Sequence, residues 1–129
     1  AIQDLCTRWE INAGSGWTVN LNLEPAALNS LDQDRALCVY RTVEECLANV
    51  RRHASTGSPV RVGLALRENV LELRVDNRMP APAETQVPSG GMGLNLLAER
   101  VRVHGGAFKA EVEENLFVVS ARFQQKGIA

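Results

Sequence analysis

The chain has 129 residues, of which 45% are hydrophobic and 22% charged, and its formal net charge is −1. This length fits one packed domain, and the composition is that of an ordinary globular protein. The near-zero charge gives no bulk attraction to nucleic acid or to an anionic membrane surface. No apolar run reaches the ~20 residues that a membrane-spanning helix needs, and no signal peptide is visible.

The first half of the chain predicts a helix, a strand and a long helix. Residues 2–13 place their apolar side chains on one helical face. Residues 17–23 alternate apolar and polar side chains, as a half-buried strand does. Residues 25–30 are interpreted as a connection. Residues 31–54 form the longest predicted helix, with an apolar stripe at the helical period.

The second half predicts four strands and one helix. Glu68 and Asn69 suit a tight hairpin turn, because asparagine tolerates positive φ, and a second turn falls near Asn115. Residues 77–91 have no period, which predicts a long loop that is either a functional lid or disordered. A helix is predicted over 92–104. The strands are the segments in which apolar and polar residues alternate: 60–66, 71–75, 108–112 and 117–123.

Each predicted strand has one apolar and one polar face, which is typical of an antiparallel-rich sheet with one side in water. The helices must then cover the other side. We therefore predict an α+β fold, a two-layer α/β sandwich. Its sheet would be mixed, mostly antiparallel and five-stranded, with about three helices on one face.

The cysteines are Cys6, Cys38 and Cys46, and no pair has C-x-x-C spacing. We expect three free, buried thiols that act as small hydrophobic side chains in a reducing cytoplasm. A catalytic cysteine is not favoured, because no ordered Cys–His arrangement is evident.

Three polar residues of the long helix, Glu45, Asn49 and Arg52, are predicted to cluster on the side opposite the apolar stripe. A carboxylate and an amide oxygen suit Mg²⁺, which prefers oxygen ligands and keeps several waters. The guanidinium could reach a phosphate oxygen. The alternative is a solvated helix face with i,i+4 contacts, which the spacing alone favours. His53, on the flank, is by itself more often a structural or surface histidine.

Asp76 is predicted to end a strand and to open the long loop. Its ordinary role there is turn formation, and its functional role would be to accept a hydrogen bond from an exocyclic amine. Gly90, Gly91 and Gly93 flank the start of the last helix, where free N–H groups and the helix dipole favour an anion. Their spacing matches neither the Rossmann nor the Walker pattern, so those sites are disfavoured.

Taken in order, these segments resemble the ATP-binding catalytic (HATPase) domain of sensor histidine kinases, of the GHKL or Bergerat type shared with gyrase and MutL-type ATPases. Residues 40–55, "YRTVEECLANVRRHAS", are similar to the E-x-x-x-N-x-x-[KR]-H-[AS] pattern of the N box in the nitrate-sensor and desaturase-sensor subfamily. "RVDNRMP" stands where the D-x-G box falls, and "SGGMGLNLLAERV" is similar to G-x-G-L-x-x-x-x-E-R. The resemblance spans about residues 17–124.

The resemblance implies a role for each candidate site residue. Asn49 would bind the Mg²⁺ that bridges the phosphates of ATP. Glu45, the catalytic residue, would hold the metal or polarise a metal-bound water. Arg52 would lie near the phosphates in place of a lysine, and Asp76 would bind the adenine amino group. Residues 79–90 would be the ATP lid. The other nucleotide-binding residues would be His53, Gly91, Gly93 and Leu94.

The resemblance also implies partners. In such kinases the phosphoacceptor histidine lies on a separate dimerisation helix pair, and neither His53 nor His104 looks like it. Residues 1–16 would then end the connecting helix, and 17–129 would form the catalytic domain, within the cytoplasmic portion of a bacterial two-component kinase. The domain would bind ATP with Mg²⁺ and serve a response regulator indirectly, with no contact to nucleic acid or membrane.

Arg78 departs from the pattern, because the D-x-G box has glycine there. Arginine adds bulk and a Cβ that disfavours positive φ. Two alternatives remain open. One is a degenerate relative that acts as an interaction module with weak or no nucleotide binding. The other is an anti-sigma-type serine kinase with the same fold, which "NVRRHA" and "GLNLLAER" resemble less than the sensor-kinase version.

Overall fold

The computed structural model describes residues 2–14, 16–53, 59–79 and 93–125. Its five-stranded sheet has the order β1-β2-β3-β5-β4, with β1 and β2 parallel and the other neighbours antiparallel. The predicted mixed, mostly antiparallel sheet is therefore confirmed. The elements are α1 (Ile2–Ala13), β1 (Val19–Leu23), α2 (Pro25–Asn29), α3 (Gln33–His53), β2 (Val60–Arg67), β3 (Val70–Arg78), α4 (Gly93–Val103), β4 (Gly106–Glu113) and β5 (Leu116–Gln124).

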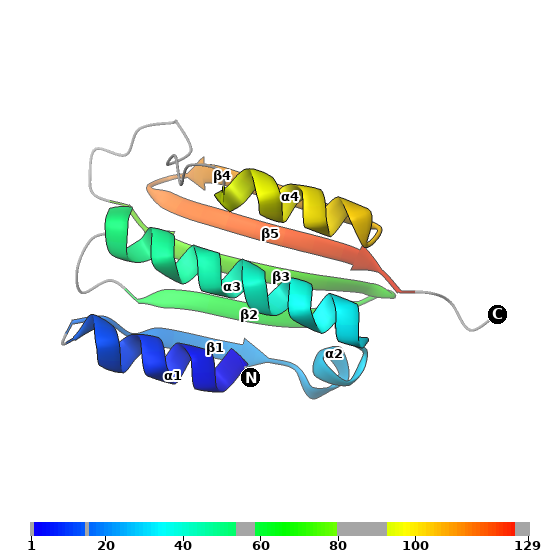
Figure 1. Ribbon diagram of the computed structural model, residues 1–129, viewed down its shortest axis with the longest axis horizontal. Helices are drawn as coiled ribbons and strands as arrows, with labels where there is room; N and C mark the ends of the chain where they lie inside the picture. Colours follow the sequence, from blue (N-terminus) through cyan, green and yellow to red (C-terminus); the bar gives the residue numbers. More distant parts are fainter. Residues whose placement is uncertain (1, 15, 54–58, 80–92, 126–129) are drawn as a thin grey trace.

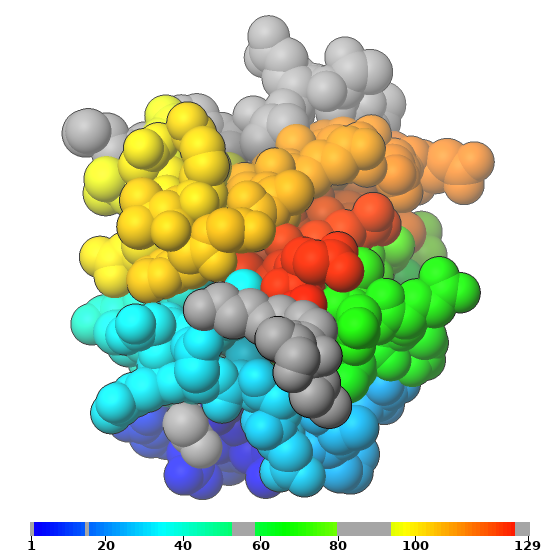
Figure 2. All heavy atoms as spheres, turned by 90° about the vertical axis from the view of Figure 1, so that its right-hand side faces the viewer, coloured from blue at the N-terminus to red at the C-terminus, as the bar shows by residue number. Residues whose placement is uncertain are grey.

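The helices α1, α3 and α4 lie side by side over one face of the sheet (Figure 1). Viewed from the end at which the β2–β3 turn lies, the helices occupy one side of the molecule and the strands the other (Figure 2). We call the face away from the helices the outer face. None of the described helices is long and apolar enough to cross a membrane. The core fills the space between the two layers, and its largest fully buried side chains include Leu47, Leu64, Leu71, Leu73, Val101 and Phe123.

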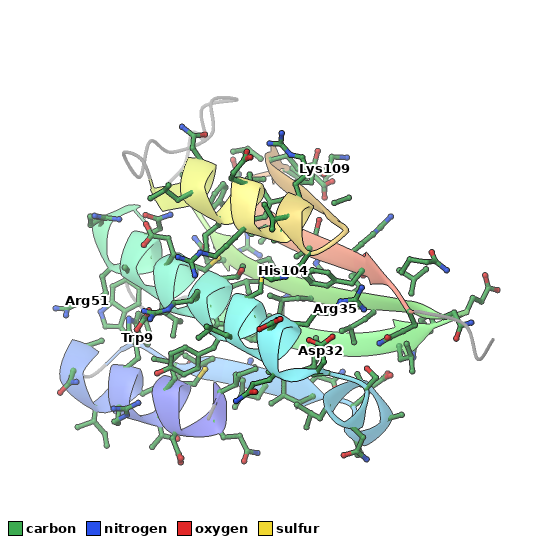
Figure 3. All side chains as sticks on the ribbon, turned by 45° about the vertical axis from the view of Figure 1, so that its right-hand side comes forward. Trp9, Asp32, Arg35, Arg51, His104 and Lys109 are labelled. Carbon is green, nitrogen blue, oxygen red and sulfur yellow. The ribbon has the colours of Figure 1, made fainter. Side chains whose placement is uncertain are left out.

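The helix α3 is fixed at both its start and its flank. Asp32 Oδ1 accepts a hydrogen bond from the backbone N–H of Arg35 at 2.8 Å, which caps the first turn. The Arg35 guanidinium lies 5.2 Å from the centre of the Phe123 ring and donates to the Gln124 carbonyl (Figure 3). The start of α3 is therefore tied to the end of β5.

The helix α1 packs on the same core as the rest of the molecule. Ile2 and Cys6 are buried in that core. Trp9 lies between α1 and α3 and meets Trp17 edge to face, with ring centroids 5.7 Å apart (Figure 3). Glu10 Oε2 accepts the backbone N–H of Val19 at 2.8 Å. The assignment of residues 1–16 to a connecting helix stays a prediction.

Both predicted hairpin turns are confirmed. Glu68 and Asn69 have φ of 51° and 65°, and Glu114 and Asn115 have φ of 46° and 70°. Paired positive φ values match the right-handed twist of the flanking strands. These turns fix the β2–β3 and β4–β5 registers. The registers decide which side chains face the helices and which face the outer side of the sheet.

Two local predictions were wrong. Residues 25–30 are not a plain connection, because Pro25–Asn29 form α2. Proline is favourable in the first turn of a helix, where a backbone N–H would have no partner within the helix. The strand β3 also does not end at Asp76. It continues through Asn77 and Arg78, which pair with Phe117 and Leu116 of β5.

Candidate nucleotide site

Three segments that carry candidate residues meet at one end of the molecule. The C-terminal end of α3, the C-terminal end of β3 and the N-terminal end of α4 lie together there (Figure 1). This follows from the topology, because β3 runs toward that end and α4 packs beside α3 and β4. The fold therefore brings the three resembling sequence segments to one place.

Glu45, Asn49 and Arg52 form what we call the α3 polar cluster. Arg52 Nη2 donates to Asn49 Oδ1 at 2.5 Å and lies 3.8 Å from Glu45 Oε1. The side chains of Glu45 and Arg52 are 28% and 54% exposed. The predicted clustering of these three residues is confirmed.

Asn49 is buried, so this side of α3 is not the solvated helix face of the alternative interpretation. Thr42 is also fully buried on this side of the helix, and its hydroxyl donates to the Cys38 carbonyl at 2.8 Å. The buried arc is wider than the apolar stripe because α4 packs beside α3. The stripe alone could not reveal the second helix.

The Asn49 side chain is only half satisfied. Its Oδ1 accepts from Arg52, whereas its buried Nδ2 has no hydrogen-bond partner among the residues that the structure describes. An unpartnered buried donor costs about 1–3 kcal/mol, and such a group in a folded protein calls for an explanation. A ligand that accepts a hydrogen bond from Asn49 would supply one.

Asp76 lies on the outer face of the sheet. Successive side chains of a strand point to opposite faces of the sheet. Leu73 and Val75 of β3 face the helices, so Arg74 and Asp76 face the other way. Asp76 is 4% exposed; its Oδ1 accepts from Arg61 Nε at 2.7 Å and its Oδ2 accepts from Arg74 Nε at 3.0 Å. The structure therefore does not bring Asp76 together with the α3 polar cluster.

A cavity of about 300 Å³ lies beside Asp76, but it opens on the outer face. Gly63 lies in the strand register between Asn22 and Arg74 and leaves a gap there. The cavity is lined by Asn20, Leu21, Asn22, Arg61, Val62, Gly63, Arg74 and Asp76. None of these residues belongs to the α3 polar cluster.

Asn77 is the polar residue of β3 that faces the helices. It follows Leu71, Leu73 and Val75 in the two-residue alternation, pairs with the core residue Phe117, and is 4% exposed. Sequence reasoning missed it because the predicted strand ended at Asp76, two residues before β3 ends at Arg78. Continuing the alternation past Val75 would have found it.

Some of the remaining candidate site residues lie among the residues that the structure describes, and others do not. Gly93 is the first residue of α4, and Leu94 is buried in the core. His53 is the last residue of α3, and its side chain lies outside the described residues. Gly91 and the predicted lid beyond Met79 also lie outside them. Arg78 is exposed in regular strand and has no positive φ, so its Cβ meets no backbone strain.

The donor set of the α3 polar cluster fits Mg²⁺. Among the described residues, no three His, Cys, Asp or Glu side chains converge as a metal site. The amide oxygen of Asn49 and the carboxylate of Glu45 are hard oxygen donors within reach of one nitrogen atom of Arg52. Mg²⁺ is held in just this way by one or two protein oxygens, with phosphates and waters as its other ligands.

The three cysteines are free and buried, as predicted. Burial raises the pKa of the Cys46 thiol to about 12 and that of Cys6 to about 11. Burial also raises the pKa of Cys38. A thiol with so high a pKa is a poor nucleophile near neutral pH, so none of the three is a candidate for covalent catalysis.

Comparison with known proteins gives a fold. The sequence matches no protein-family model and no curated protein. The structure of Acinetobacter baumannii histidine kinase AdeS is similar over 98% of this chain and 64% of its own, with a TM-score of 0.75 and 10% identity. The histidine kinase domain from the Erythrobacter litoralis EL346 blue-light activated histidine kinase is similar over 96% and 59%, with a TM-score of 0.74 and 15% identity. The catalytic domain of histidine kinase ThkA is similar over 96% of this chain and 90% of its own, with a TM-score of 0.70 and 14% identity.

The chain thus has the fold of histidine kinase catalytic domains. It spans less than two thirds of the AdeS and EL346 structures and nearly all of the ThkA catalytic domain.

Proposed function

We propose that this chain is the ATP-binding catalytic module of a sensor histidine kinase of the nitrate-sensor and desaturase-sensor type. It would present ATP with Mg²⁺ to a histidine on a separate dimerisation domain, in the cytoplasm, and pass the signal on to a response regulator. The observation that carries the proposal is the α3 polar cluster. It combines a buried, half-satisfied Asn49 with Glu45 and Arg52, and it lies beside the start of α4 in this fold.

Phosphoryl transfer depends mainly on positioning and on neutralising charge. The Arg52 guanidinium would bind a phosphate oxygen, and the N–H groups of the first turn of α4, from Gly93, would donate to the phosphates. Asn49 and Glu45 would hold Mg²⁺, which offsets the phosphate charge when bound. Glu45 would also orient water beside the phosphates. Leu94 would support this turn from the core, and His53 and Gly91 would border the phosphates.

We propose Asn77, in place of Asp76, as the group of β3 that binds adenine. Asn77 faces the helix layer that carries the α3 polar cluster, whereas Asp76 faces the outer side with Arg61 and Arg74. A carboxamide offers both an acceptor and a donor, and its oxygen can accept from the exocyclic amine of adenine.

Titration with a non-hydrolysable ATP analogue and Mg²⁺ tests the proposal. We expect a Kd of roughly 10–100 μM for the wild type, the affinity of a few good contacts. Asn49→Ala should weaken binding at least tenfold, while Asn22→Ala, an exposed asparagine of the outer face, should leave it unchanged. No binding by folded wild type at millimolar analogue would refute the proposal.

A second candidate is a degenerate member of the fold that acts as an interaction module. It is favoured by the engagement of Asp76 with two arginines and by Arg78 in place of the motif glycine. Arg78→Gly separates the candidates. If this variant gains ATP binding that the wild type lacks, the degenerate module is the better description.

The serine-kinase alternative predicts a different product. Phosphohistidine is acid-labile, whereas phosphoserine is acid-stable. Acid treatment of a partner that becomes phosphorylated by the full kinase therefore distinguishes the two.

A further inference from the structure

We infer that Arg52 competes with the divalent cation for the oxygens of Asn49 and Glu45, so that metal uptake depends on nucleotide. The inference rests on the proposed function and concerns the order in which the site is filled. A phosphate that draws Arg52 away would release both oxygens for the cation. Arg52 would therefore be a positioning residue that links the two ligands.

The orientation of the Asn49 side chain is set by Arg52. The guanidinium carries only donors, so the group that faces it must be the amide oxygen and not the amide nitrogen. Arg52 Nη2 donates to Asn49 Oδ1, and a hydrogen bond from a charged donor is stronger than one between neutral groups. The metal-binding atom of Asn49 is therefore the atom that Arg52 holds.

The second oxygen donor lies beside the same guanidinium. Glu45 Oε1 is 3.8 Å from Arg52 Nη2, so one cationic group is close to both expected metal ligands. A guanidinium stays protonated at any ordinary pH, and a divalent cation on the same oxygens would meet its positive charge at short range. The two cations would share the single negative charge of Glu45, so each disfavours binding of the other unless a further anion is present.

The phosphates of a nucleotide are such an anion. Arg52 has a half-exposed side chain, so it can turn without breaking the core. Planar guanidinium groups bind phosphate oxygens in a bidentate manner and strongly. When Arg52 turns to a phosphate, Asn49 and Glu45 regain free oxygen lone pairs, and the cation gains the phosphate oxygens as well.

Arg51 provides a matched control. It is the neighbouring arginine on α3 and is exposed. Figure 3 shows it projecting from the end of α3 toward the side of α1, away from the side on which α4 lies. Loss of the Arg51 charge changes the net charge of the protein equally but leaves the α3 polar cluster intact.

The test is a titration of the folded protein with Mn²⁺ alone, followed by paramagnetic broadening of the amide and side-chain NMR signals of residues 45–52. We expect Arg52→Gln to bind Mn²⁺ roughly tenfold more tightly than the wild type, within the range usual for coupled ligands. Arg51→Gln should match the wild type. Equal Mn²⁺ affinity in all three proteins would overturn the inference.

Two further arms identify the cause. Arg52→Lys keeps the positive charge, so its Mn²⁺ affinity should stay near that of the wild type. If Arg52→Lys binds Mn²⁺ as tightly as Arg52→Gln does, the positive charge is not the cause and the inference is overturned. A non-hydrolysable ATP analogue should strengthen Mn²⁺ binding more in the wild type than in Arg52→Gln; an equal gain in both would also overturn it. If no protein binds the analogue, the proposed function fails, while the titrations with Mn²⁺ alone still decide the competition.

Discussion

The Asp76 carboxylate accepts a hydrogen bond from Arg61 Nε at 2.7 Å, across the β2–β3 pair and on the outer face of the sheet. Arg74 binds its other oxygen at 3.0 Å. A carboxylate that is 4% exposed and held by two guanidinium groups is satisfied where it lies. Its placement indicates a structural role on the outer face, although the D-x-G pattern predicts a role in nucleotide binding.

Asp76→Asn and Asn77→Ala should separate stability from binding. Asp76→Asn leaves the partly exposed Arg61 and Arg74 without their anion, and we expect a loss of about 1–3 kcal/mol in the free energy of unfolding. Its ATP-analogue affinity should be unchanged. Asn77→Ala should weaken binding of the ATP analogue roughly tenfold, which corresponds to the loss of one hydrogen bond. Urea unfolding and calorimetric titration measure the two quantities; loss of binding in folded Asp76→Asn would restore the original assignment of Asp76.

Local patterns predicted the strands well because period-two alternation and the turns at Asn69 and Asn115 act within a few residues. They predicted less where distant elements decide the outcome. Asn49 is buried because α4 packs beside α3, which no spacing within α3 reveals. The strand β3 extends past Asp76 because β5 pairs with Asn77 and Arg78. The apparent loop composition after Asp76 hid that pairing, and with it the residue that faces the helices.

Gly106→Ala should destabilise the fold, whereas Gly63→Ala should not. A Cβ at Gly106 would lie 2.7 Å from Phe123 Cδ1 and 2.8 Å from the Arg122 carbonyl oxygen. Phe123 is fully buried, so its ring cannot move aside freely, and we expect a loss of roughly 1–3 kcal/mol. At Gly63 the nearest atom would be the Asn22 carbonyl oxygen at 3.9 Å. Thermal unfolding of both variants checks this, and equal midpoints would contradict the packing of β4 on β5.

The cysteines should resist thiol reagents in the native protein. Burial raises the pKa of Cys46 to about 12 and that of Cys6 to about 11, so almost no thiolate is present at pH 8. We expect labelling by a disulfide reagent to follow global or local opening and to become fast only in denaturant. Rapid labelling of Cys46 in folded protein at pH 8 would show that its side of α3 is not buried against the core. Cys46→Ser supplies the baseline for its share of the signal.

Glu24 should contribute stability that disappears in acid. Its Oε1 accepts from Arg67 Nη1 at 2.9 Å and from the Leu66 backbone N–H at 3.2 Å. The hydrogen bond from Arg67 is the larger cause, and the backbone bond the smaller, of a Glu24 pKa below its ordinary value of 4.5. A carboxyl group whose pKa is lowered in the folded protein binds its proton more readily when unfolded. Its stabilising effect is therefore complete above pH 4.5 and is lost as the pH falls through the lower, folded pKa.

Glu24→Gln should accordingly be less stable than the wild type near pH 7, and the two proteins should converge as the pH falls below the folded pKa of Glu24. Arg67→Gln removes the other partner and should show the same convergence, because the pair titrates through the carboxylate. The double variant should cost less than the two single variants together, since the partners act on one interaction. Urea unfolding at a series of pH values measures all four proteins. A stability difference that stays constant from pH 7 to pH 3 would mean that the Glu24 carboxylate is not ion-paired with Arg67, so that the β1–α2 connection is held to β2 by bonds to backbone groups such as the one from Glu24 N–H to the Leu64 carbonyl.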